Sequence, residues 1–362
     1  MMVLLSAAVN GVGSALNWTA SGEYISKCAS DENRGFFFSF FFFMYMSSQI
    51  VGSIIAAVVL QNSEMLTLHI VMSIVMLVGC LLFLLLKNPT KRKSDIIQNG
   101  SESNNDSQSM LESPQQISKR KVVDKNNKSS SIFTSEFDQN KDLTYSYEIQ
   151  NKKSQSQFKK DIIDTFRLLK SKCMIFMIPF QLLVGISQSL YIGAFMIILT
   201  NSMVDKGWDS NKQLSMSFYA MIPLGVGELI GSIIIGNYID KYGHKATIIP
   251  CLISLVVACT LVICHCAINQ FTILAYFMTF FWGVFDSFIN NLMNCMLGFE
   301  FESNNTPYSV STAVWSTSFF IVLILEAQMS SNFHYLILLT CSLVYGIISL
   351  AILSKFKFKS KQ

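Results

Sequence analysis

The sequence predicts an all-α polytopic membrane protein, built as a bundle of bilayer-spanning helices. Hydrophobic residues make up 51% of its 362 residues, charged residues only 14%, and the mean hydropathy is +0.42, which is too apolar for a water-soluble chain. The apolar stretches continue for about 20 residues without alternation, which favours helices and excludes a transmembrane β-barrel. The charge is concentrated elsewhere, since residues 87–170 hold 16 of the 27 Lys and Arg residues.

Nine apolar stretches bounded by polar residues predict nine membrane-spanning helices. Each is long enough for a hydrocarbon core of about 30 Å, because a helix rises about 1.5 Å per residue. In chain order the predicted spans are Met2–Ala20, Phe36–Leu60, Leu66–Leu86, Met174–Thr200, Leu214–Ile239, Thr247–Cys266, Phe271–Leu297, Val310–Ala327 and Tyr335–Leu353.

The polar segment divides these spans into three plus six. Residues 87–172 are rich in Asn, Ser, Gln and Lys, a composition that buries too little apolar area to fold, so we expect a disordered loop. The sequence therefore predicts three parts. They are an N-terminal group of three helices in residues 1–86, the loop in residues 87–172, and a six-helix bundle with a short tail in residues 173–362.

The distribution of basic residues predicts the orientation, since Lys and Arg accumulate on the cytoplasmic side of a membrane protein. If the long loop is cytoplasmic, only Lys206 and Lys212 of the 27 basic residues lie on the opposite side. The C-terminus is then cytoplasmic, and nine spans place the N-terminus across the membrane. We expect an integral multi-pass membrane protein that is embedded in the lipid bilayer.

A short loop in the C-terminal half resembles a motif of the major facilitator superfamily. The segment GNYIDKYGHK, Gly236–Lys245, matches the pattern G-x-x-x-D-[RK]-x-G-[RK]-[RK], with His244 in place of one basic residue. Gly236 allows close helix approach, Gly243 permits a tight turn, and Asp240 can accept from backbone N–H groups at a helix start. Lys241 and Lys245 complete the motif. The alternative is an ordinary charged hairpin loop.

The N-terminal segment resembles the signature of one branch of that superfamily. GVGSALNWTASGEY is similar to the G-x-G-A-A-x-x-W-T-A-Q-G-x-Y pattern of the uncoordinated-ninety-three family, whose members regulate ion channels. The matching positions include Gly11, Gly13, Trp18, Thr19, Gly22 and Tyr24. Three later segments are similar to that family in the same order: residues 34–53, 185–195 and 281–291.

The resemblance implies a twelve-helix facilitator fold of which nine transmembrane helices are present here. The signature helix is the fourth of twelve in that family, so we expect either a late-starting gene model or a truncated relative. The resemblance also implies a function, the regulation or escort of membrane proteins such as ion channels. By the pseudo-symmetry of the implied fold, Asp240 should dock at the start of the helix that begins near Gly35, with Arg34 as the nearby cation.

Polar side chains inside predicted spans suggest a cavity. Trp282, Asp286, Asn290 and Asn294 recur every four residues, forming one stripe along their helix. A second stripe holds Gln181, Gln188 and Tyr191, and we expect the two stripes to face one another across a central cavity. Asp286 has two interpretations of equal weight, a role in coupling and a structural role in which neighbouring Asn side chains satisfy it.

Two further acidic residues lie in apolar stretches, where a buried charge costs on the order of 3 kcal/mol. Glu228 is flanked by Gly227 and Gly231, so we expect its helix to pack closely and its carboxylate to bond across that contact. Glu326 lies near the non-cytoplasmic end of its span, where we expect it to reach water and to have no role.

The remaining patterns argue against several functions. The sequence has no phosphate-binding Gly-rich loop and no nucleophile elbow, so we expect no enzyme activity and no cofactor. Residues 264–266, Cys-His-Cys, cannot all aim at one ion, so no metal site is expected. The placement of the basic residues does not favour a nucleic-acid partner. The alternative to a regulator is a secondary transporter for a small polar or anionic solute, with proton coupling at Asp286.

Overall fold

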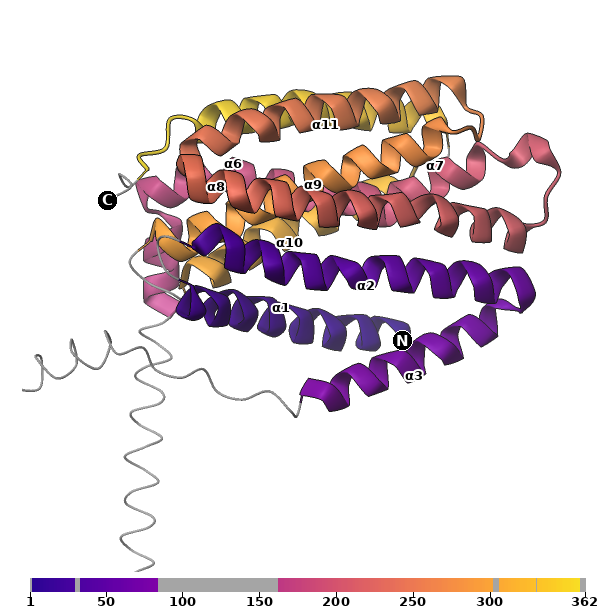
Figure 1. Ribbon diagram of the computed structural model, residues 1–362, viewed down its shortest axis with the longest axis horizontal. Coiled ribbons are helices and arrows are strands. Elements are labelled where there is room, and N and C mark those ends of the chain that lie inside the picture. The colour runs from indigo at the N-terminus through magenta and orange to yellow at the C-terminus, as the bar shows by residue number, and fades with distance from the viewer. Residues whose placement is uncertain (1, 30–32, 84–161, 302–305, 330, 359–362) are drawn as a thin grey trace, which may run out of the picture. The chain divides into compact units, whose positions relative to one another are not determined.

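The computed structural model describes residues 2–29, 33–83, 162–301, 306–329 and 331–358, and in these ranges the chain forms helices and no strand (Figure 1). The prediction of an all-α membrane helix bundle is confirmed. The elements are α1 (Met2–Cys28), α2 (Arg34–Asn62), α3 (Met65–Phe83), α6 (Lys172–Ser189), the π-helix η1 (Leu190–Ala194), α7 (Phe195–Asn201), the 3-10 helix η2 (Val204–Lys206), α8 (Ser210–Ile268), α9 (Leu274–Phe299), α10 (Thr306–Ala327) and α11 (Asn332–Leu353).

Within the described ranges, six helical segments are long and apolar enough to cross a membrane. The longest of them, Ser210–Ile268, has 59 residues and turns at Gly243, where φ is 79° and ψ 174°, so it contains two of the predicted spans. α1 and α9 also coincide with predicted spans, with 27 and 26 residues. As far as the described residues reach, each of the nine predicted spans lies on a helix.

The three N-terminal helices and the helices after residue 163 form one compact unit, Met1–Leu86 with Ile163–Gln362. Most of the predicted loop lies outside the described residues. Its last part differs from the prediction, because residues 162–169 are helical rather than disordered. The apolar side chains of Ile162, Ile163 and Phe166 recur on that short helix, a pattern that the surrounding polar composition concealed.

Glycines determine how closely the helices approach. α2 lies beside α8 along much of its length (Figure 1). At one end of that contact, Gly35 and Gly236 touch backbone to backbone, and a methyl group on Gly35 would overlap the carbonyl oxygen of Gly236. α8 and α9 meet in the same way at Gly227 and Gly283. Such contacts let backbones approach where side chains would hold them apart.

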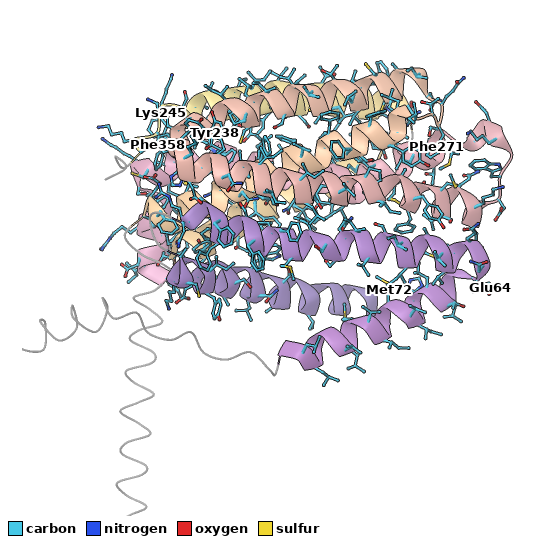
Figure 2. All side chains as sticks on the ribbon, in the orientation of Figure 1. Glu64, Met72, Tyr238, Lys245, Phe271 and Phe358 are labelled. Carbon is cyan, nitrogen blue, oxygen red and sulfur yellow. The ribbon has the colours of Figure 1, made fainter. Side chains whose placement is uncertain are left out.

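The two ends of the bundle differ in the residues that they carry. Figure 2 shows Lys245 and Phe358 at one end, and Glu64 and Phe271 at the other. The motif loop and the C-terminal tail therefore share an end, which is the arrangement that the basic-residue distribution predicts. The assignment of that end to the cytoplasm stays a prediction.

Candidate functional site

A cavity of about 750 Å³ lies between α1, α2, η1 and α10. Its polar groups include Thr19, Gln188 and Thr312, and its apolar groups include Met46 and Ile192. A second space of about 20 Å³ adjoins it, sharing four lining residues and adding Asn290 and Asn294 from α9. The smaller space has room for roughly one water molecule. Together they form a polar and aromatic site of a size suited to a small solute.

Asp286 lies directly behind this site, fully buried on α9. Its Oδ1 accepts a hydrogen bond from Ser187 Oγ at 3.0 Å, and its Oδ2 accepts one from Asn290 Nδ2 at 2.9 Å. Gln188 connects this group to the cavity, because its Nε2 donates to Asn290 Oδ1 at 3.5 Å. The carboxylate is therefore one side chain away from the cavity wall.

Glu228 is the second acidic group of the site, and its surroundings overturn our expectation. Its side chain is fully buried on α8, yet neither carboxylate oxygen has a hydrogen-bond partner in the described structure. Glu228 interacts electrostatically with Asp286. Each of these two carboxylates also interacts electrostatically with Tyr45 and Tyr191 of the cavity wall. A buried carboxylate without partners is costly, so a purely structural bond across the helix contact does not explain it.

The close packing around Glu228 is as predicted and holds the residue in place. A methyl group on Gly227 would overlap the carbonyl oxygen of Phe280, and one on Gly283 would overlap that of Leu224. Gly231 lies against Val284, with 3.2 Å between the added carbon and Val284 Cα. The backbones of α8 and α9 thus touch on both sides of Glu228, which leaves its carboxylate no route to water through that interface.

Glu326 also differs from the prediction. It is buried, with 3% of its surface exposed, and its Oε1 accepts from Ser189 Oγ at 3.0 Å. Its Oε2 has no hydrogen-bond partner in the described ranges and lies against Gly193. The sequence placed this residue in reach of water because it is near the end of its span, but α6 and η1 cover it.

The π-helix η1 begins directly after the segment of α6 that bonds to the buried acids. Ser187 and Ser189, two residues apart just before η1, donate to carboxylates on two different helices, Asp286 on α9 and Glu326 on α10. The backbone N–H of Phe195 then bonds to the carbonyl of Leu190, five residues back. Single π-helical turns inside α-helices occur frequently at functional sites. In this protein the π-helical turn comes directly after the two serines that donate hydrogen bonds to Asp286 and Glu326.

Five of the predicted cavity residues come together, and two do not. Asp286, Asn290, Asn294, Gln188 and Tyr191 line or adjoin the two spaces. Trp282 is buried against Phe195 instead, with ring centroids 4.9 Å apart. Gln181 is also buried, and its Nε2 reaches Met174 Sδ at 3.4 Å. Gln188 on the first stripe and Asn290 on the second line the smaller space together and bond to one another, whereas Gln181 and Trp282 lie away from it.

The sequence did not single out some residues of the site, and it assigned another to a different role. Ser187, Tyr45 and Trp315 did not stand out, because a serine, a tyrosine or a tryptophan in an apolar helix is common. Trp18 was assigned only to the family signature, and the structure places it on the wall of both spaces. Nothing in the local sequence shows which distant helix a side chain will meet.

The other signature residues have mixed positions. Gly11 and Thr19 line the larger cavity. Gly22 packs under the ring of Tyr308, so it lets α1 approach α10, whereas an added carbon at Gly13 would meet nothing within 4 Å. The side chain of Tyr24 is exposed. The signature therefore combines cavity lining with helix packing.

The motif loop docks where the resemblance predicts. Asp240 accepts hydrogen bonds from the backbone N–H groups of Gly35 at 2.7 Å and Phe36 at 2.9 Å, at the start of α2. A carboxylate there is favoured by the positive end of the helix dipole. The predicted contact is confirmed, and it joins two parts of the chain 205 residues apart. Lys241 and Lys245 are exposed beside it.

The one departure from the motif has a partner of its own. His244 is buried, and its Nδ1 lies 2.6 Å from Glu300 Oε1, just past the end of α9. Arg34 lies over the ring of Phe299, 5.2 Å from its centroid. The docked loop is therefore in contact with both α2 and the end of α9.

The family model of the Major Facilitator Superfamily matches residues 1–323. No curated protein matches the chain significantly. The family match covers most of the sequence, and the helical bundle and the docked motif loop agree with it. This integral multi-pass membrane protein therefore belongs to the major facilitator superfamily.

Proposed function

We propose that this chain is a secondary transporter, whose cavity binds a small polar solute and whose buried acids couple solute movement to a proton. Members of the superfamily are typically transporters rather than enzymes. The observation that carries the proposal is Asp286, a fully buried carboxylate held by Ser187 and Asn290 one side chain from the cavity. Ionisable residues inside a membrane commonly mark ion and proton pathways.

The pairing of Asp286 with Glu228 supports proton coupling. Two interacting carboxylates in a low-dielectric interior cannot both remain charged without a compensating proton or cation. In the described structure, none of the ion pairs includes either group. A proton on the pair can therefore leave when a solute or a conformational change alters its surroundings.

The docked loop supports a change of conformation in the same cycle. Asp240 bridges α8 to α2, and the contact must break before those helices can separate at that end. In a transporter that rocks two helix bundles against each other, such contacts hold one closed state. Gly236, Asp240, Lys241, Gly243 and Lys245 are therefore proposed as a conformational loop.

Replacing Asp286 with asparagine tests the proposal. Asparagine keeps the size and accepts from Ser187, but it cannot carry the proton. In vesicles containing the purified chain, we screen labelled small polar solutes for counterflow, then impose a pH gradient. We expect Asp286→Asn to retain counterflow while accumulation driven by a gradient of about one pH unit falls about tenfold, because one coupled proton then contributes about 1.4 kcal/mol.

The matched control is Asp205→Asn, an exposed acid in η2 outside the cavity, which should leave both measurements unchanged. If Asp286→Asn accumulates solute as well as the parent chain, the proton is not carried at Asp286. If no solute shows counterflow with the parent chain, transport itself is contradicted.

The second candidate function is regulation or escort of another membrane protein, such as an ion channel. It is favoured by the resemblance of Gly11–Tyr24 to the uncoordinated-ninety-three signature. A regulator would keep its association with its partner after Asp286→Asn, because that residue is fully buried and cannot touch another protein. Co-purification of a channel with both variants, without any counterflow, would favour this function.

A further inference from the structure

The wall of the cavity is rich in aromatic rings. On α1 and α2, Trp18 lies edge-on to Tyr45 at 5.0 Å and stacks on Phe42 at 6.4 Å, measured between ring centroids. These three rings form one continuous surface. Six lining side chains are aromatic in all, drawn from α1, α2, η1 and α10: Trp18, Phe42, Tyr45, Tyr191, Trp315 and Phe319.

The charges around the cavity have one sign. No lysine, arginine or histidine is among the described residues that line it. Behind the wall lie Asp286 and Glu228, and both interact electrostatically with Tyr45 and Tyr191. A ligand in the cavity therefore meets electron-rich aromatic rings in front of two buried acids.

Glu228 is the second buried acid near this wall. Both of its oxygens are buried and lack a hydrogen-bond partner in the described structure. Packed helices rarely leave a carboxylate in this state unless a proton or another group satisfies it. A positive charge held at Tyr45 and Tyr191 would interact favourably with Glu228 and Asp286 at once.

We propose that the cavity binds an organic cation, a small ammonium compound with apolar substituents, with its charged group among Trp18, Tyr45 and Tyr191. Aromatic rings bind such weakly hydrated cations well, whereas protein sites for hard metal cations are built around carboxylates, and no carboxylate is among the described residues that line this wall. The proposal names a substrate class for the proposed transporter. Movement of the ligand across the membrane rests on that proposed function, whereas binding of the ligand does not. This class departs from the anionic solute that the sequence left open.

Three probes of similar shape and different charge test the inference. They are choline, its neutral analogue 3,3-dimethylbutan-1-ol and the anion 3,3-dimethylbutanoate. Binding to the purified full chain in detergent is measured by calorimetry, or by competition with labelled choline. We expect choline to bind at least about tenfold more tightly than the neutral analogue, as a desolvated cation–π site provides, and the anion to bind least.

Variants of the rings locate the site. Trp18→Leu and Trp315→Leu should each weaken choline binding several-fold, to about tenfold, while Trp18→Phe should retain most of it. The matched control is Trp208→Leu, which removes a tryptophan from the link before α8, outside the cavity lining. Asp286→Asn should weaken binding of choline but not of the neutral analogue.

The outcomes separate this inference from transport itself. The inference is overturned if the neutral or anionic probe binds as tightly as choline, if none binds, or if the leucine variants bind choline as the parent does. If choline binds in the expected order but is not moved across vesicle membranes, the cation site stands and the transport proposal fails.

Discussion

Gly283→Ala is expected to destroy the native packing of the bundle. The added methyl group would overlap the carbonyl oxygen of Leu224 and lie 3.0 Å from the backbone nitrogen of Glu228. Because both neighbours are backbone atoms, no side-chain rotation relieves the clash, and α8 and α9 must move apart. Overpacking of this kind costs about 3 kcal/mol, a large part of the stability of a typical protein.

The measurement is the thermal stability and monodispersity of the purified variant. Gly52→Ala and Gly79→Ala are the matched controls, since an added carbon at either position meets nothing within 4 Å. We expect Gly283→Ala, and Gly227→Ala across the same interface, to aggregate on extraction while both controls behave like the parent. Equal melting temperatures for Gly283→Ala and Gly79→Ala would show that α8 and α9 do not touch in this way.

Asp240→Ala is expected to open the docked end and expose Cys295. Cys295 is fully buried on α9, with Sγ 3.9 Å from the carbonyl oxygen of Arg34 at the start of α2. Loss of two charge-assisted hydrogen bonds, to Gly35 and Phe36, removes about 3 kcal/mol in total, which is about a hundredfold in a two-state equilibrium. The rate of Cys295 alkylation by N-ethylmaleimide should rise accordingly.

The experiment uses a chain in which the other eight cysteines are replaced by serine or alanine. Lys355→Ala is the matched control, because Lys355 is exposed just past the end of α11 and lies outside the conformational loop, and the alkylation rate of this variant should equal that of the parent. Asp240→Asn, which keeps one acceptor oxygen, should fall between the two. Parent-like labelling of Asp240→Ala would contradict a closing role for the loop.

The sequence anticipated those features that depend on periodicity or on a local motif. The nine helical stretches follow from continuous apolar runs, and the docking of Asp240 follows from a motif and the symmetry of the fold it resembles. The stripe Asp286, Asn290 and Asn294 follows from fourfold spacing on one straight helix, and its members do bond in succession.

Features that depend on which helices become neighbours could not be anticipated. Glu228 lies in a small-xxx-small pattern that predicts close packing but not the absence of a partner for its carboxylate. We expected Glu326 to reach water because it lies near the end of its span, whereas Ser189 and Gly193 of another helix cover it. The stripe of Gln188 and Tyr191 runs into η1, where the change from α to π geometry alters the faces that follow.

The π-helix also determines how this protein would respond to the loss of a single residue. A deletion in an α-helix rotates everything beyond it by about 100°, which normally ruins packing on one side. Between Leu190 and Ala194 a deletion would instead convert the wide π turn into an ordinary α-helical turn, so α6 and α7 keep their orientation and Phe195 stays against Trp282. The loss of one residue at this place can therefore be absorbed without disturbing the packing on either side of it, unlike a loss elsewhere in the same span.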